Sequence, residues 1–164
     1  MLAYLCGPIE FAPDQGKLWR RKIRPFLEEE LRHSVYDPAA DEKKDLTEDE
    51  IAHFREWKET DAERYRRAVR KIINYDLDII ENKADYLICF WDNMAAQSGG
   101  TAAEMTAAYR KGIPVYLVTE EPLSLISGWM LACADRIFRS LEELKAYFQE
   151  TYGRQARQTA LWSR

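Results

Sequence analysis

A glycine-rich turn followed by a glutamate is the clearest chemical signal in this chain. Ser98, Gly99, Gly100 and Thr101 follow an apolar run, and Glu104 comes three residues after Thr101. Two adjacent glycines leave backbone N–H groups accessible to an anion or to the hydroxyls of a ligand. With Thr101 as the N-cap, Glu104 is predicted to lie in the first turn of a helix, where the helix dipole favours its ionised form. An ionised glutamate beside such a turn is a candidate nucleophile.

The same glutamate also has a purely structural explanation. Thr101-x-x-Glu104 has the form of a capping box, a pattern that stabilises the start of a helix. The chain repeats this pattern three times, at Thr47-x-x-Glu50, Thr60-x-x-Glu63 and Ser140-x-x-Glu143. Two glycines precede only the copy that ends at Glu104. Glu104 is therefore either a nucleophile or a helix-capping residue. Ser98, Gly99, Gly100 and Thr101 are candidate substrate-binding residues.

Asp76 is the second residue with chemical potential. At 100° per residue, a helix over residues 65–80 places six apolar side chains within about 60° of it, namely Tyr65, Val69, Ile72, Ile73, Ile79 and Ile80. A carboxylate at the centre of an apolar face must point into a cavity or be buried with partners, because burial without them is costly. Burial should raise its pKa, which suits a group that holds or donates a proton. The alternative is a buried aspartate that caps a neighbouring loop.

Glu104 and Asp76 form a pair whose predicted environments push their pKa values apart. Such a pair suits displacement at an anomeric carbon, where one carboxylate attacks and an acid assists the leaving group. Tyr4 lies in the first apolar run and could orient a catalytic carboxylate through its hydroxyl, or could simply be a core aromatic residue. Asp92 follows another apolar run and could bind sugar hydroxyls, or could start a turn for local reasons.

A sheet of five parallel strands is expected to position these residues. Apolar runs predict the strands, three of them strong and two weaker: Leu2–Cys6, Ser34–Tyr36, Tyr86–Trp91, Pro114–Val118 and Arg136–Phe138. Helical patterns separate them, over about 14–32, 48–59, 61–82, 101–112 and 140–150. The alternation predicts a doubly wound α/β fold of the flavodoxin or Rossmann type, flanked by helices. Ligands of such sheets bind beyond the carboxyl ends of the strands, where Gly7, Pro8 and Asp92 should meet the glycine turn.

Composition and charge limit the class of protein. The 164 residues predict one α/β domain over 1–152, interrupted by a charged helical insertion at about 41–70 and followed by a tail at 153–164. A net charge of −4 gives no general attraction to nucleic acid or to anionic membranes, and no apolar run approaches membrane-spanning length. The three cysteines are widely spaced and lie in apolar segments, so we expect reduced thiols in the core. Reduced thiols indicate a reducing compartment, and we therefore expect a cytoplasmic location. We expect no metal and no cofactor.

Several segments, taken in their order, resemble motifs of the nucleoside 2-deoxyribosyltransferase family. They are Tyr4-Leu5-Cys6-Gly7-Pro8-Ile9, Asp37-Pro38, Asp76-Leu77-x-x-Ile80 with Ala84-Asp85, and Gly100-Thr101-x-x-Glu104 followed by Ala107-Ala108 and Gly112-Ile113-Pro114-Val115. The resemblance covers most of the chain outside residues 41–70 and the tail. Ser98 stands where transferases of this family commonly carry an aspartate, so hydrolysis stays open beside transfer.

The resemblance implies a function and roles for three residues. Glu104 would attack C1′ of a nucleoside or nucleotide and form a glycosyl-enzyme, which a second base or water resolves. Asp76 would handle the leaving base, and Tyr4 would position the nucleophile. The implied partners are a small-molecule nucleoside or nucleotide and further copies of this chain, because members form homo-oligomers. Two alternatives are a non-catalytic nucleotide-binding module of the same fold and a flavodoxin-like domain with another small ligand, which would leave Asp76 unexplained.

Overall fold

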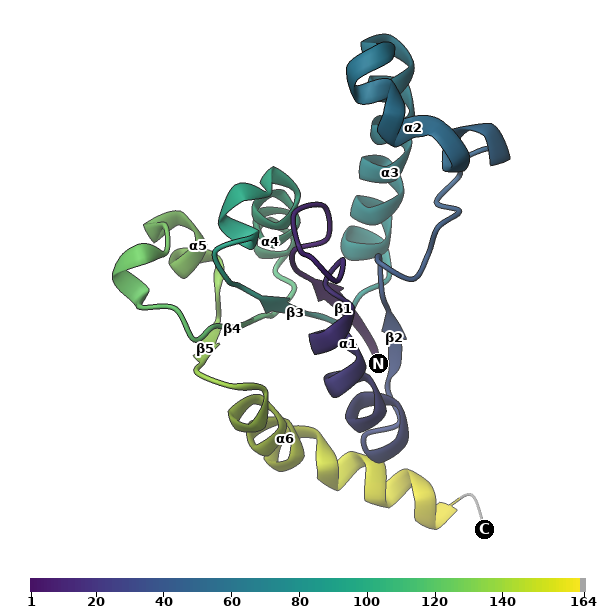
Figure 1. The fold of residues 1–164 in the computed structure, drawn as a ribbon. Helices are drawn as coiled ribbons and strands as arrows, with labels where there is room; N and C mark the ends of the chain where they lie inside the picture. The colour runs from purple at the N-terminus through teal and green to yellow at the C-terminus, as the bar shows by residue number, and fades with distance from the viewer. Residues whose placement is uncertain (163–164) are drawn as a thin grey trace.

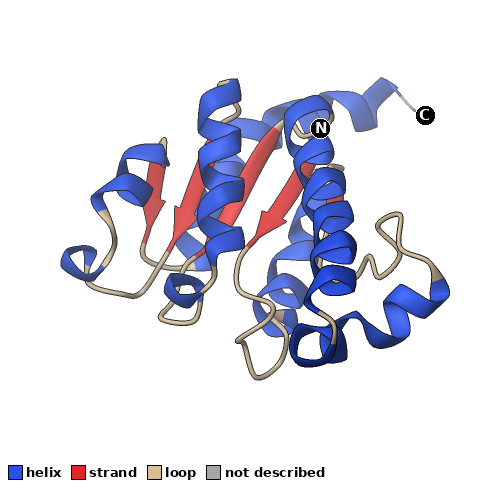
Figure 2. Cartoon of the chain, turned by 90° about the horizontal axis from the view of Figure 1, so that it is seen from above, coloured by secondary structure: helices blue, strands red, loops and turns tan. Residues whose placement is uncertain are grey.

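Five parallel strands form the centre of the computed structural model, which describes residues 1–162. The strands are β1 (Leu2–Cys6), β2 (Ser34–Tyr36), β3 (Tyr86–Phe90), β4 (Val115–Val118) and β5 (Arg136–Phe138), in the spatial order β2-β1-β3-β4-β5. Helices cover both faces of this sheet (Figure 2). The doubly wound α/β fold predicted from the sequence is therefore confirmed. Each strand forms where an apolar run can be buried between two helical layers.

The five predicted helices are all present in the predicted order, and the structure adds a sixth. The helices are α1 (Lys17–Pro25), α2 (Glu48–Thr60), α3 (Ala62–Asn82), α4 (Gly99–Lys111), α5 (Gly128–Cys133) and α6 (Leu141–Trp162). The short helix α5 was not predicted, α4 begins two residues early, and α6 continues to Trp162 through most of the segment assigned to a tail. A π-helical turn, Phe26–Glu30, extends α1.

The two faces of the sheet carry separate apolar clusters. One cluster lies under α1 and α6, and the other under α3, α4 and α5. Side chains alternate along a strand, so Ala3 and Leu5 of β1 belong to the first cluster, whereas Tyr4 and Cys6 belong to the second. The side chains of Tyr4 and Cys6 therefore face α3 and α4.

The predicted helical insertion forms α2 and the outer part of α3, away from the sheet (Figure 1). Thr47 and Glu50 form the expected capping box at the start of α2. Thr60 does not cap α3, because its hydroxyl donates to the carbonyl of Glu56 within the last turn of α2. Asp61 is the N-cap of α3 instead.

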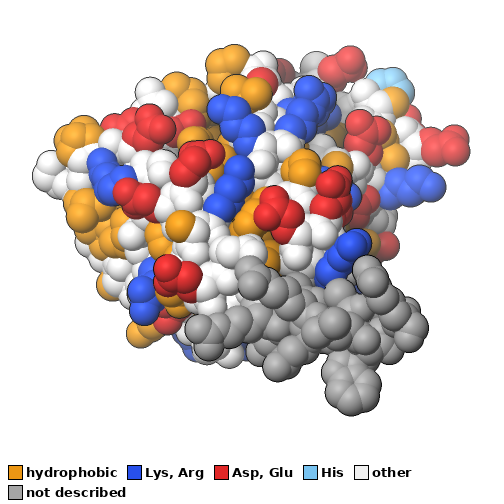
Figure 3. All heavy atoms as spheres, turned by 90° about the horizontal axis from the view of Figure 1, so that it is seen from below, with side chains coloured by type: hydrophobic (Ala, Val, Ile, Leu, Met, Phe, Trp, Pro, Cys, Tyr) orange, Lys and Arg blue, Asp and Glu red, His pale blue; other side chains and the backbone are white. Residues whose placement is uncertain are grey.

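The surface carries charges of both signs. On the face drawn in Figure 3, acidic and basic side chains are interspersed over the described residues. Within residues 1–162, no helix combines the length and the apolar character that crossing a membrane requires. The three cysteines are unpaired and buried.

Candidate active site

Glu104 and Tyr4 meet between the first strand and α4. Tyr4 is completely buried, and its hydroxyl donates a 2.7 Å hydrogen bond to Oε1 of Glu104. Two residues further along β1, Sγ of Cys6 lies 3.6 Å from the carbonyl oxygen of Thr101. Both contacts tie the first two turns of α4 to β1. The structure thus brings together two of the residues that the sequence singled out.

The predicted capping box at Thr101 is wrong. Helix α4 begins at Gly99, its N-cap is Ser98, and Ser98 makes no side-chain capping bond. Thr101 lies inside the helix and is buried. Glu104 consequently sits in the second turn rather than the first, where the helix dipole supports a negative charge less. Gly99 and Gly100 are the first two residues of the helix, which follows a short turn at Ala95–Gln97.

Burial raises the pKa of Glu104 above its ordinary value. The Cys6 thiol and the Tyr4 hydroxyl oppose this change, because both stabilise the carboxylate by hydrogen bonding, whereas the charge of Asp76 raises the pKa further. The prediction that Glu104 and Asp76 have pKa values moved in opposite directions is therefore wrong. The predicted dipole effect at Glu104 fails because the carboxyl lies deeper along the helix than expected.

Asp76 is buried with two partners. Oδ1 accepts a 3.0 Å hydrogen bond from the hydroxyl of Tyr36, and Oδ2 lies 2.7 Å from Nζ of Lys44. Burial raises the pKa of Asp76, and the ammonium group of Lys44 opposes that rise. The expectation of a buried, partnered aspartate with a raised pKa is confirmed. Lys44 and Tyr36 were missed, because they lie 32 and 40 positions away in the sequence and no local pattern connects them to Asp76.

The two carboxyl groups share one environment. Tyr4 and Tyr36 are register partners on neighbouring strands, and their ring centroids are 5.4 Å apart. The negative charge of Asp76 raises the pKa of both Tyr4 and Glu104. Glu104 with Tyr4, and Asp76 with Tyr36 and Lys44, therefore lie side by side at β1 and β2, on one face of the sheet.

The loop after β1 is held by a buried arginine that the sequence analysis did not single out. Arg20 of α1 donates to the carbonyl oxygens of Leu5, Gly7 and Pro8, and its Nε lies 3.1 Å from Oδ1 of Asp37. Gly7 has no room for a side chain, since a Cβ there would lie 3.0 Å from the carbonyl oxygen of Phe90. Arginine is the residue type that satisfies several diverging acceptors at once. Its network fixes the Gly7-Pro8 loop at the carboxyl edge of the sheet.

The other predicted binding residues lie near this edge but are not all together. Gly99 and Gly100 are exposed, and a Cβ at Gly99 would meet nothing within 4 Å. Oδ1 of Asp92 accepts hydrogen bonds from the backbone N–H groups of Met94 and Ala95, both at 2.9 Å, which is the local turn role left open above. The exposed turn at Gly99 leaves space for a ligand, whereas Asp92 has one oxygen engaged by the backbone.

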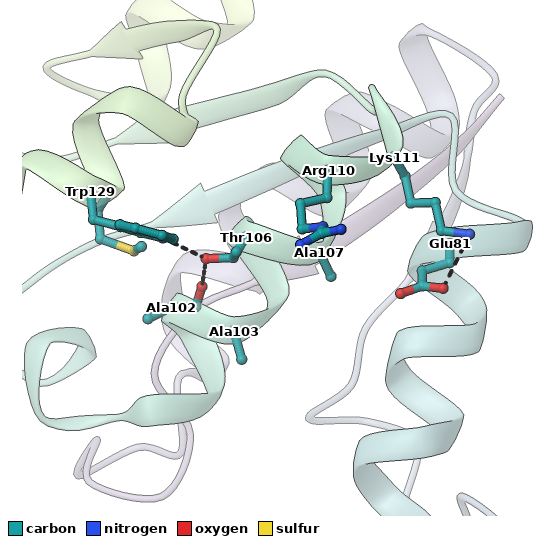
Figure 4. Close-up of a pocket in the computed structure, with 9 residues that line it drawn as sticks. Glu81, Ala102, Ala103, Thr106, Ala107, Arg110, Lys111 and Trp129 are labelled. Carbon is teal, nitrogen blue, oxygen red and sulfur yellow. Dashed lines mark hydrogen bonds and ion pairs between the residues drawn. The ribbon is translucent and has the colours of Figure 1, made fainter.

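Two cavities lie beside these residues, and neither includes the carboxyl groups of Glu104 and Asp76. A cavity of about 440 Å³ at the carboxyl ends of β1, β3 and β4 is lined by Pro8 and Asp92. A groove of about 610 Å³ runs along the outer surface of α4, between the ends of α3 and α5 (Figure 4). Trp129 borders this groove and donates a 3.0 Å hydrogen bond to Thr106. The two carboxyl groups contact Tyr4, Tyr36 and Lys44.

The arrangement supplies acid, base and hydrogen-bonding groups. Within residues 1–162, no group of three or more histidine, cysteine, aspartate and glutamate side chains is placed to hold a metal ion. A half-buried carboxylate with a hydrogen-bonded tyrosine can attack an electrophilic carbon, and a buried carboxyl with a raised pKa can transfer a proton.

The fold and the site define a doubly wound α/β protein with two coupled carboxyl groups beside the point where the chain reverses its strand order. The sequence model of the family described as nucleoside 2-deoxyribosyltransferase matches residues 3–138. The chain belongs to this family, whose members process nucleosides.

Solved structures show the same fold at low sequence identity. A 2-deoxyribosyltransferase from the psychrotolerant bacterium Bacillus psychrosaccharolyticus is 19% identical, with a TM-score of 0.58 over 88% of this chain and 90% of that chain. A conserved protein from Enterococcus faecalis V583 is 17% identical, with a TM-score of 0.56 over 92% of this chain and 98% of that chain. No curated protein sequence matches this chain.

Proposed function

We propose that this protein cleaves or transfers the N-glycosidic bond of a (deoxy)nucleoside or nucleotide through a glutamyl glycosyl-enzyme. The observation that carries the proposal is the 2.7 Å hydrogen bond from Tyr4 to Glu104, beside a buried, protonatable Asp76. Glu104 is the nucleophile, Tyr4 orients it, and Asp76 is the acid and base. The family to which the chain belongs supports a nucleoside substrate.

The first half of the reaction uses both carboxyl groups. One oxygen of ionised Glu104 bonds to C1′ while the C1′–N bond breaks and its electron pair stays with the base. Asp76 gives its proton to the base, so that the base leaves neutral. Tyr4 restrains the Glu104 carboxylate, since its hydroxyl donates a hydrogen bond to Oε1. A positioned nucleophile of this kind lowers the entropic part of the barrier.

The second half returns the protein to its starting state. Water or a second base attacks C1′ and releases Glu104, and Asp76 takes up the proton that the attacking group loses. The exposed backbone at Gly99 and Gly100 offers N–H groups to substrate hydroxyls or to a 5′-phosphate. Ser98 provides no carboxylate at the start of α4, and this favours hydrolysis as the alternative to base transfer.

A substrate panel tests the proposal. Purified protein is incubated with nucleosides, deoxynucleosides and their 5′-monophosphates, with and without an acceptor base, and free base is measured by liquid chromatography. Glu104→Ala should lose base release by a factor of about a thousand or more, while rapid quenching of wild type should give a sugar adduct on Glu104 by mass spectrometry. Glu143→Gln, which changes another glutamate of the same sequence pattern, is the matched control and should keep full activity.

A non-catalytic nucleotide-binding module is the second candidate. It is favoured by the burial of Glu104, which raises the pKa and so opposes an ionised nucleophile in the free protein. Such a module would show a ligand-dependent rise in melting temperature with no substrate consumed and with the same rise in Glu104→Ala. Base release across the panel excludes this alternative.

We also infer that copies of this chain assemble. Large apolar side chains are exposed around α4 and α5, at Tyr109, Leu123, Leu125 and Trp129, and Trp129 is 66% exposed. Clustered exposed apolar residues are typical of contact surfaces. Light scattering after size-exclusion chromatography should give a mass of two or more chains, and Trp129→Glu should lower it.

A further inference from the structure

Lys44 is buried although it belongs to the charged segment between β2 and α2. Its side chain is only 8% exposed, and its Nζ lies 2.7 Å from Oδ2 of Asp76. Lys44 and Asp45 both have left-handed backbone conformations, with φ values of 37° and 61°. Residues other than glycine adopt such values at a cost. The chain thus accepts backbone strain and the burial of an ammonium group in order to bring this lysine to Asp76.

Anchoring the segment does not require this lysine. Oδ2 of Asp41 lies 3.2 Å from the hydroxyl oxygen of Tyr36, and Oδ1 of Asp37 accepts a hydrogen bond from the backbone N–H of Ala39, so the segment is already tied to the end of β2. A buried ion pair is also a poor source of stability, because apolar residues of similar volume usually serve as well or better. The position of Lys44 therefore calls for an explanation at Asp76 itself.

The ammonium group has spare hydrogen-bonding capacity. A lysine ammonium carries three donors, and within residues 1–162 Asp76 is the only acceptor that Nζ contacts. Ionisable groups near Asp76 are Tyr36, Asp41 and Lys44, together with Tyr4 on the neighbouring strand β1 and Glu104, to which Tyr4 is hydrogen-bonded. Lys44 is the one group among them that offsets a negative charge on Asp76.

We propose that Lys44 is a positioning residue for the leaving-group step, which holds Asp76 in place and neutralises the carboxylate that remains after Asp76 has given its proton to the departing base. This inference rests on the function proposed above. The electron pair of the broken C1′–N bond goes to the base, the proton goes from Asp76 to the base, and the new charge on Asp76 faces the Lys44 ammonium at hydrogen-bond distance. No further reactant is needed.

The role predicts a dependence on the leaving group. A natural base needs a proton to leave well, whereas 4-nitrophenolate leaves as an anion without one. Lys44→Gln keeps a hydrogen-bond donor for Asp76 but removes the charge, and Lys44→Met removes both. Lys43→Met changes the exposed neighbouring lysine and is the matched control. Circular dichroism and melting curves show which variants are folded at the assay temperature.

The experiment compares kcat and KM for the best nucleoside of the panel with those for the 4-nitrophenyl glycoside of the same sugar. Lys44→Gln should lower kcat for the nucleoside about tenfold or more, within the range of general acid catalysis, and change kcat for the 4-nitrophenyl glycoside less than about threefold. Because Lys44 lowers the pKa of Asp76, the descending limb of the kcat pH profile should move to higher pH. Lys44→Met should likewise lower kcat for the nucleoside and move the descending limb to higher pH, and Lys43→Met should change neither.

Two results for Lys44→Gln would overturn the role of Lys44 and leave the proposed function standing. One is an equal loss of kcat on the nucleoside and on the 4-nitrophenyl glycoside. The other is a raised KM with an unchanged kcat and an unmoved pH profile. If the 4-nitrophenyl glycoside is not a substrate, the descending limb of the pH profile measured with the nucleoside decides the role of Lys44. A wild-type protein that releases no base from any nucleoside would instead overturn the proposed function, and the role of Lys44 with it.

Discussion

Replacing Tyr4 by phenylalanine removes one hydroxyl and leaves the rest of the site in place. The ring of Tyr4 is fully buried and packs on Tyr36, so phenylalanine keeps those contacts. The loss is the 2.7 Å hydrogen bond to Glu104. A hydrogen bond to a charged group is worth about 1.5–3 kcal/mol, and each 1.4 kcal/mol corresponds to about a factor of ten. We therefore expect kcat/KM for base release to fall roughly tenfold to a hundredfold.

The pH profile distinguishes an effect on Glu104 from a general loss. Tyr4 stabilises the ionised form of Glu104, so its removal should raise the pKa of Glu104 beyond the rise already caused by burial. Activity that needs ionised Glu104 then appears at higher pH, and the ascending limb of the kcat/KM profile shifts to higher pH. Tyr109→Phe, which changes a 58% exposed tyrosine on the same helix as Glu104, is the control. A folded Tyr4→Phe protein with unchanged kcat/KM and an unmoved ascending limb would refute the assignment of Tyr4.

Three further predictions concern the stability of the site. Gly99→Ala adds a methyl group in open space at the first residue of α4, so it should stabilise the protein by about 0.4–1 kcal/mol and should raise KM if the bare backbone binds substrate. Thermal melts and kinetics on one sample check both, and an unchanged KM would remove Gly99 from the binding site. Because burial raises the pKa of Glu104, its contribution to stability is fully present below the unfolded pKa and lost as the pH rises through the folded one. Glu104→Gln should therefore raise the melting temperature over wild type more at pH 8 than at pH 4, and an equal or reversed difference contradicts the burial argument. Asp76→Leu leaves the Lys44 ammonium buried without a partner and should lower the free energy of unfolding by about 3–5 kcal/mol. Denaturant unfolding should show that Asp76→Leu combined with Lys44→Met recovers much of this loss. A double variant as unstable as the single one speaks against a stabilising Asp76–Lys44 ion pair.

Local patterns in the sequence were reliable where the structure depends on local chemistry. The five strands lie where the apolar runs predict them, and the observed strands end within one residue of the predicted ends. The burial of Asp76 followed from its place at the centre of an apolar helical face. The start of α4 was wrong because Thr101-x-x-Glu104 fits two registers, and the contact of Thr101 with Cys6 on β1 selects the one in which Thr101 is buried.

The partners of the carboxyl groups could not be read from the sequence. Lys44 is one of many charged residues in its segment, and only the fold turns it inward to Asp76. Arg20 follows a tryptophan in an ordinary amphipathic helix, and its four carbonyl acceptors come from β1, from the loop after it and from the N-cap of α1. The pKa of Glu104 depends on depth of burial, which is a property of the packed molecule.

The sequence by itself determined the α/β class, the strand positions, the family resemblance and the two carboxylates with Tyr4, because each of these depends on residue type and on spacing along the chain. The tertiary structure decided which groups meet: it joined Tyr4 to Glu104 across 100 positions and Lys44 to Asp76 across 32. It also replaced the expected division of pKa values by a common rise at both carboxyls. The physical reason is that hydrogen bonds and desolvation act through space, over distances that the order of residues does not encode.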